Sequence, residues 1–122
     1  MGKHSILIVD DEKSIRDTLR MTLEYEGYAV SEAESGQQAL DTVRRHAPDA
    51  ILLDVKMSGM DGLETLEHLR REAPGVPVVL LTGHGSIETA VEATKKGAFD
   101  FLSKPPDREK ILITLRNAIT QT

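Results

Sequence analysis

Hydrophobic residues along the chain follow two alternating patterns. Short runs of β-branched and aliphatic residues are separated by longer segments in which apolar residues recur every three or four positions. Two runs, 51–53 and 78–81, are continuously apolar, as expected for strands covered on both faces. Buried helix segments are the alternative, but the short lengths and the proline and glycine borders favour strands. The predicted strands are 5–9, 28–33, 50–54, 76–82 and 99–102.

Five segments with helical periodicity accompany these strands. The first has Ile15, Leu19 and Leu23 on one face, which is the amphipathic pattern of a helix packed on a core. Capping and breaking residues then predict where the helices begin and end. We expect Gly27 after the first helix, Ser35 before the second and Pro48 after it, Pro74-Gly75 after the third, Ser86 before the fourth and Gly97 after it, and Asp107 at the start of the fifth.

The order of the elements predicts an α/β fold. Five successive strand–helix units imply a doubly wound, five-stranded parallel sheet with right-handed crossovers and five helices on its two faces. A length of 122 residues fits one domain, which we assign to residues 1–122. In such sheets the functional site lies outside the carboxyl ends of the strands. Polar residues should therefore gather where the strands stop.

Polar and charged residues do follow four of the predicted strands. Each has a simpler explanation: an acidic pair can begin a helix, a threonine can close a strand, and a lysine beside a proline can face solvent. An aspartate that closes an apolar strand is harder to dismiss, because a buried carboxylate without a partner is costly. Their convergence on one edge favours a site. The residues are Asp10, Asp11 and Glu12 after the first strand, Asp54 closing the third, Thr82 closing the fourth and Lys104 after the fifth.

The charges at this edge indicate which chemistry it suits. Asp10, Asp11 and Asp54 against Lys104 leave two negative charges in excess, and oxygen ligands suit Mg²⁺ better than Zn²⁺. A carboxylate can also act as a nucleophile and form an aspartyl-phosphate. Mg²⁺, Lys104 and the Thr82 hydroxyl would then stabilise the charge on the transferred phosphoryl group.

Composition removes several other classes of protein. The chain has no cysteine, which excludes disulfides and thiolate metal sites. Its net charge of −5 argues against nucleic-acid binding by this domain. No apolar run approaches the ~20 residues of a membrane span, and the N-terminus lacks a signal-peptide pattern. We therefore expect a cytoplasmic protein.

Together these residues resemble the receiver domain of two-component response regulators over nearly the whole chain. The resemblance implies a flavodoxin-like sheet with strand order 2-1-3-4-5. It also implies a signalling domain that promotes its own Mg²⁺-dependent phosphorylation and dephosphorylation, and is otherwise no enzyme. The stretches that carry the resemblance are 8–12, 53–57 with 59–62, 81–85 and 99–105.

The resemblance assigns roles to the matched positions. Asp54 would accept a phosphoryl group from the phosphohistidine of a sensor histidine kinase. Asp11 and Asp54 would ligate Mg²⁺ directly, Asp10 would act through water, and the main-chain carbonyl of Lys56 would be a further ligand. Thr82 and Lys104 would each bind a phosphoryl oxygen.

The family also implies a conformational switch. Phe101 would turn inward when Thr82 moves towards the phosphate, although an aromatic residue in a strand can equally be part of the core. The Lys104–Pro105 bond would be cis. The changed surface would comprise the fourth helix, the fifth strand and the fifth helix. Candidate residues on that surface are Ile87, Val91, Lys95 and Arg116, and the roles of Lys56, His84 and Pro106 beside the pocket stay open.

Residues 82–93 and 96–100 resemble receivers of the nitrogen-regulation type most closely. In those proteins an ATPase that activates sigma-54-dependent transcription and a DNA-binding module follow the receiver. The chain is then either a fragment of a longer regulator or a stand-alone receiver, and we favour the fragment, with a possible phosphorylation-dependent homodimer. Three alternatives remain: an aspartyl-nucleophile phosphatase or dehalogenase, a flavodoxin-like cofactor carrier, and an unphosphorylated interaction domain.

Overall fold

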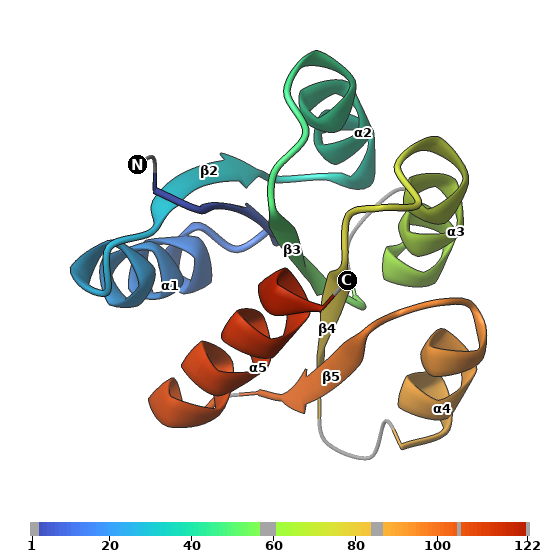
Figure 1. The fold of residues 1–122 in the computed structure, drawn as a ribbon. Coiled ribbons are helices and arrows are strands. Elements are labelled where there is room, and N and C mark those ends of the chain that lie inside the picture. The colour runs from blue at the N-terminus through green and yellow to red at the C-terminus, as the bar shows by residue number, and fades with distance from the viewer. Residues whose placement is uncertain (1–2, 57–60, 84–86, 105, 122) are drawn as a thin grey trace.

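The computed structural model describes residues 3–56, 61–83, 87–104 and 106–121, without the side chains of Ile87 and Ala90. Its five strands form one parallel sheet in the order β2-β1-β3-β4-β5, as predicted (Figure 1). Strands β3 and β4, which contain the apolar runs 51–53 and 78–81, are buried along their whole length, and this explains their continuously apolar sequences. The strands are β1 (Ser5–Val9), β2 (Ala29–Ala33), β3 (Ala50–Asp54), β4 (Val78–Thr82) and β5 (Asp100–Ser103).

Five helices cover the two faces of this sheet. Helices α1 and α5 lie on one face, and α2, α3 and α4 lie on the other (Figure 1). Alternate residues of β1 supply the two cores: Ile6 packs with Leu19 and Leu115, whereas Leu7 packs with Leu40 and Leu66. The helices are α1 (Lys13–Tyr25), α2 (Gly36–Arg45), α3 (Gly62–Glu72), α4 (Ile87–Lys95) and α5 (Arg108–Thr120).

Most of the predicted ends of helices and strands agree with the structure. Gly27 follows α1 with a φ of +95°, a conformation that glycine adopts without strain. The Ser35 hydroxyl caps α2 by accepting a hydrogen bond from the Gln38 amide at 3.1 Å. Strand β4 starts at 78 rather than 76, because Pro77 has no N–H to give to the ladder. The predicted cap Ser86 lies outside the described residues.

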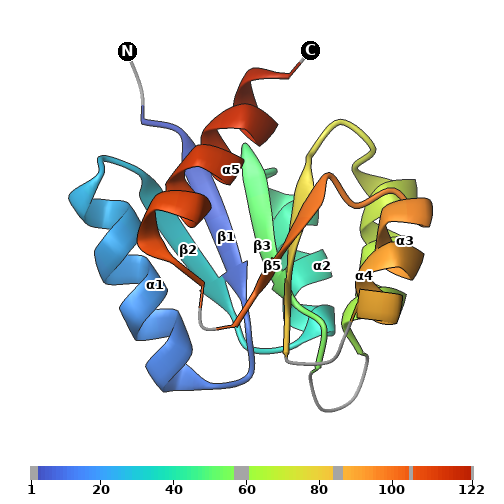
Figure 2. The ribbon, with the colours of Figure 1, turned by 90° about the horizontal axis from the view of Figure 1, so that it is seen from below.

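Both ends of the described chain lie at the same end of the sheet. The strands point away from the two termini (Figure 2). Lys3 and Thr120 line a common cleft with Gly27, which precedes β2. The carboxyl ends of the strands, and any site built there, are thus at the opposite end of the molecule.

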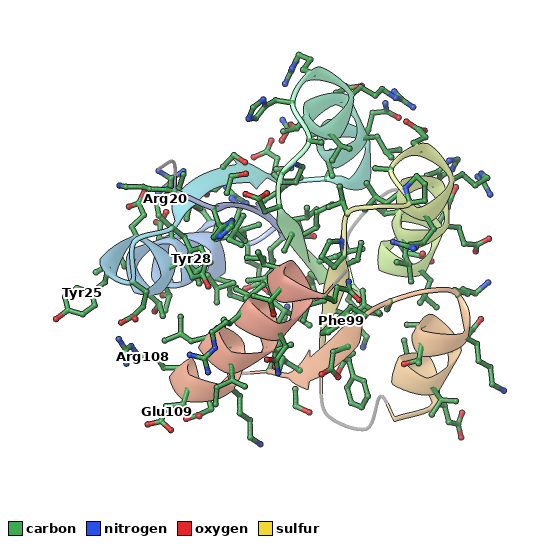
Figure 3. All side chains as sticks on the ribbon, viewed as in Figure 1. Arg20, Tyr25, Tyr28, Phe99, Arg108 and Glu109 are labelled. Carbon is green, nitrogen blue, oxygen red and sulfur yellow. The ribbon has the colours of Figure 1, made fainter. Side chains whose placement is uncertain are left out.

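Helices α1 and α5 also contact each other outside the core. The Arg108 guanidinium lies over the Tyr25 ring, 5.9 Å from its centroid, and the same side chain pairs with Glu26 (Figure 3). Within the part of the chain that the structure describes, no helix is long and apolar enough to cross a bilayer.

Candidate functional site

The sheet register brings the predicted residues together at one edge. Asp54 pairs with Leu81 across β3 and β4, and Thr82 pairs with Ser103 across β4 and β5. The hydrogen bonds between strands continue for one residue beyond the ends of β1 and β5. The Asp10 amide donates to the Ala33 carbonyl at 3.1 Å, and the Lys104 amide donates to the Thr82 carbonyl at 2.7 Å. The main chain therefore fixes where these side chains begin.

Lys104 connects the two buried carboxylates. Its Nζ lies 2.8 Å from Asp54 Oδ1 and 3.2 Å from Asp10 Oδ2. Asp10 is fully buried and Asp54 is 3% exposed. Burial acts to lower the pKa of Lys104, but the two carboxylates outweigh it and raise that pKa above its ordinary value.

For Asp54 the effect of burial on the pKa is larger than that of the groups that stabilise its anion. Burial raises the pKa of its carboxyl group above the ordinary value, and the negative charge of Asp10 adds to this effect. The Lys104 ammonium and the Lys56 amide, which donates to Asp54 Oδ1 at 3.3 Å, act in the other direction without compensating fully. One ammonium shared by two carboxylates leaves the anionic form of Asp54 short of positive charge.

The acidic segment after β1 does not act as a conventional helix cap. Helix α1 has Glu12 as its N-cap residue, with no side-chain capping bond. Asp10 Oδ1 instead accepts a hydrogen bond from the Glu12 amide at 2.9 Å. Carboxylate oxygens of Asp10, Asp11 and Glu12 lie within 4.8 Å of one another. Glu12 is thus a further candidate ligand, although the sequence analysis gave it no metal-binding role.

A cleft of about 510 Å³ opens beside this segment. Asp11 and Glu12 line one side of it, and Lys56 lines another. Carboxylate oxygens in excess over a single ammonium form a donor set that suits a hard divalent cation. The residues present therefore fit the Mg²⁺ that the sequence predicted. The other lining residues are Val55, Asp61, Leu63 and Thr89.

Thr82 and Phe101 lie on the β5 side of the site. The Thr82 hydroxyl donates to the Leu102 carbonyl across the sheet at 3.4 Å. Phe101 is 39% exposed, so it does not have the position of a core residue, whereas Phe99 is partly buried against the α1–α5 core (Figure 3). Pro105 and His84 lie outside the described residues.

Two residues that support the site were not predicted. Arg16 of α1 is buried, and its Nη1 donates to the Asp10 carbonyl at 2.7 Å. Gly62 begins α3 so close to β3 that a Cβ atom there would lie 2.4 Å from the Asp54 carbonyl oxygen. The available signal for Arg16 was its spacing, because it shares the inward face of α1 with Leu19 and Leu23.

The sequence pattern of the family described as "Response regulator receiver domain" matches residues 6–116. The chain is 44% identical over 117 residues to the transcriptional regulatory protein ZraR of Klebsiella oxytoca, covering 96% of this chain and 26% of that protein. It is 43% identical over 118 residues to the nitrogen assimilation regulatory protein NtrX of Azorhizobium caulinodans, covering 95% and 26%. The chain thus spans about a quarter of the length of these relatives.

Solved structures give the same result. The receiver domain of NtrX from Brucella abortus superposes with a TM-score of 0.93 at 37% identity, covering 96% of this chain and 99% of that one. The chemotaxis protein CheY4 of Vibrio cholerae superposes with a TM-score of 0.89 at 34% identity, covering 96% and 99%. The resemblance to receivers of the nitrogen-regulation type is confirmed. The chain therefore belongs to the response regulator receiver family of two-component systems.

Proposed function

We propose that residues 1–122 form a receiver domain that accepts a phosphoryl group on Asp54 in a Mg²⁺-dependent reaction. The observation that carries this proposal is the Lys104 ammonium shared between two buried carboxylates, at 2.8 Å from Asp54 and 3.2 Å from Asp10. A partly exposed ammonium beside a carboxylate nucleophile is well placed to bind an oxygen of an incoming phosphoryl group.

Asp54 is a better acceptor than Asp10. Both oxygens of Asp10 are engaged, one by the Glu12 amide and the other by Lys104, and the residue is fully buried. Asp54 ends the central strand β3, just before Lys56 on the cleft. An Asp54 carboxylate oxygen would attack the phosphorus of a phosphohistidine, the P–N bond would break, and the released imidazole nitrogen would keep the electron pair and take a proton.

The acidic residues would hold the metal. Asp11 and Asp54 would be direct ligands, the Lys56 carbonyl a further one, and Asp10 would act through water. Bound Mg²⁺ would supply charge compensation for the phosphoryl oxygens. The proximity of the Asp10, Asp11 and Glu12 carboxylates supports this assignment and adds Glu12 as a residue near the metal.

Phosphorylation would then change the surface of α4, β5 and α5. The phosphoryl group adds about −1.5 to −2 charges, which Thr82 would approach as a hydrogen-bond donor. Phe101 would fill the space that Thr82 leaves, and its exposure of 39% leaves it room to move inward. Val91 and Lys95 of α4 are exposed and would form part of the altered surface. Arg116, which the sequence also suggested for this surface, instead lines a cleft with Gly27 and Tyr28 at the end of the sheet where the chain termini lie. Shifting a population from 1:99 to 99:1 needs about 5.5 kcal/mol, of which new charge-assisted hydrogen bonds would supply a large part.

The partners follow from this role. A cytoplasmic sensor histidine kinase would donate the phosphoryl group, and the altered surface would control a homodimer. In the full-length protein, an ATPase and a DNA-binding module would follow and activate sigma-54-dependent transcription. The domain itself would catalyse only its own phosphorylation and dephosphorylation.

Labelling with acetyl phosphate tests the acceptor. In Mg²⁺ the wild-type protein should gain one phosphoryl group per chain that alkali and hydroxylamine remove, and Asp54→Asn should gain none. Asp41→Asn, which changes an exposed aspartate of α2, should label like the wild type. Continued stoichiometric labelling of Asp54→Asn would refute the assignment. Steady hydrolysis of phosphate esters by the wild type would instead favour a phosphatase.

A further inference from the structure

A buried arginine lies directly beneath the acidic segment. Arg16 is 9% exposed and forms part of the inward face of α1, where the other buried residues are leucines. Burying a guanidinium is costly unless its donors are satisfied. In this structure Nη1 donates to the Asp10 main-chain carbonyl at 2.7 Å, and Nε donates to Glu32 Oε1 at 2.9 Å.

The second partner ties this arginine to an edge strand. Glu32 belongs to β2, and its carboxylate also pairs with Arg20, one turn further along α1. The Asp10 main chain is therefore fixed on both sides. Its amide donates to the Ala33 carbonyl of β2, and its carbonyl accepts from Arg16. Both hydrogen bonds connect Asp10 to β2, the first directly and the second through Arg16 and Glu32.

The charge of Arg16 is unfavourable for the function proposed above. A cation close to Asp10 repels Mg²⁺, so electrostatics alone predicts that removing Arg16 strengthens metal binding. The orienting effect of Arg16 acts in the other direction: if Arg16 holds the metal ligands in place, removing it weakens metal binding. Residues that orient metal ligands typically contribute about 10- to 100-fold to metal affinity. Which effect is larger decides the role of Arg16.

We infer that Arg16 is a positioning residue: it fixes the main chain of Asp10, and thereby the carboxylates of residues 10–12, in the arrangement that binds a divalent cation. Glu32 in turn fixes Arg16. This inference rests on the proposed Mg²⁺ site. The two hydrogen bonds at 2.7 and 2.9 Å, the burial of the guanidinium and the double attachment of Asp10 support it.

The test is a Mg²⁺ titration of the unphosphorylated protein, followed by the amide resonances of residues 10–12 and by calorimetry. Arg16→Met should bind Mg²⁺ about tenfold more weakly than the wild type. Glu32→Ala, which keeps Arg16 but removes the nearer of its two carboxylate partners and leaves Glu34 at 3.8 Å, should weaken binding less. Arg44→Met is the matched control, because it removes an exposed arginine that pairs with Glu72 at the α2–α3 contact. Its Mg²⁺ affinity should not change.

A second measurement needs no metal. The Glu12 amide donates to Asp10 Oδ1, so its exchange with solvent reports the geometry of the segment. In metal-free Arg16→Met this exchange should accelerate more than that of α5 amides. A variant that was only less stable would show a general acceleration. If Arg16→Met does not fold, Glu32→Ala supplies both measurements.

Tighter or unchanged Mg²⁺ binding by the folded variants would overturn the inference, because it would show that charge repulsion dominates or that Arg16 has no effect. Absence of Mg²⁺ binding by the wild type would instead refute the proposed function. In that case the Glu12 exchange rate would still decide whether Arg16 positions the segment.

Discussion

Replacing Lys104 by methionine removes the cation that lies between Asp54 and Asp10. Methionine keeps much of the length and apolar character of the lysine stem, so the change is mainly one of charge. Removing one partner of a buried ion pair typically costs about 3–5 kcal/mol. The Lys104 side chain is 22% exposed and water can partly replace its charge, so we expect the lower value, about 3 kcal/mol at pH 7 without Mg²⁺.

Two conditions should reduce this loss. Without the ammonium, the pKa of Asp54, already raised in the folded protein, rises further. The folded variant then binds more protons than the unfolded chain as the pH falls towards the ordinary aspartate range, so its stability deficit should shrink on acidification. Mg²⁺ should also replace the missing charge. The variant lacks the ammonium that repels the cation, so it should bind Mg²⁺ more tightly than the wild type. At ten times the variant's dissociation constant Mg²⁺ then adds about 1.4 kcal/mol to the variant and less to the wild type.

The assay is thermal and urea unfolding of both proteins at pH 7 and pH 5, with EDTA or Mg²⁺. A loss of about 3 kcal/mol corresponds to a fall of roughly 10 °C in Tm for a domain of this size. Lys96→Met is the matched control: Lys96 pairs with Glu67 at 3.1 Å, with side-chain exposures of 31% and 44%, and a pair that exposed contributes under about 1 kcal/mol. If Lys104→Met loses no more stability than Lys96→Met, or if its loss is independent of pH and Mg²⁺, the charge balance deduced here is wrong.

Two further changes test neighbouring parts of the site. Asp54→Asn should be more stable than the wild type at pH 7 in EDTA, because the folded-state pKa of Asp54 is raised and its anion opposes folding. In urea unfolding, the difference in unfolding free energy between the two proteins should become smaller towards pH 4. A variant less stable than the wild type would contradict the raised pKa. Gly62→Ala should lower the free energy of unfolding by about 3 kcal/mol in the same assay, despite alanine's better helix propensity. The new Cβ would lie 2.4 Å from the Asp54 carbonyl oxygen and 2.5 Å from Val55 Cα. A stabilised variant would show that α3 can move away freely.

The sequence was sufficient to predict the sheet and its polar edge. Parallel strands end together, so Asp54 and Lys104 could be placed near each other from their positions after apolar runs. Arg16 could not be assigned in the same way. A charged residue on a helix is ordinarily expected to be exposed to solvent, and only the folded structure shows that Arg16 contacts the Asp10 carbonyl. Gly62 belongs to a stretch that carries the family resemblance, but its role could not be predicted, because its constraint comes from β3 across the turn rather than from its own neighbours.

Asp61 gives a similar lesson for the helix that follows the site. Its side chain caps α3 by accepting from the Glu64 amide at 2.8 Å, and it also lines the cleft. The sequence predicted where this helix ends, at Pro74-Gly75, but not its first residue. Local hydrogen bonding decided that boundary.

The position of the chain ends has a practical consequence for experiments. Lys3 and Thr120 lie at the amino-terminal end of the sheet, away from the cleft beside Asp11 (Figure 2). A biotin or fluorophore attached at either end would sit at the opposite end of the strands from the pocket. Protein immobilised on a sensor surface through such a tag would present the pocket to the flow, and binding of a kinase could be timed without steric interference from the support.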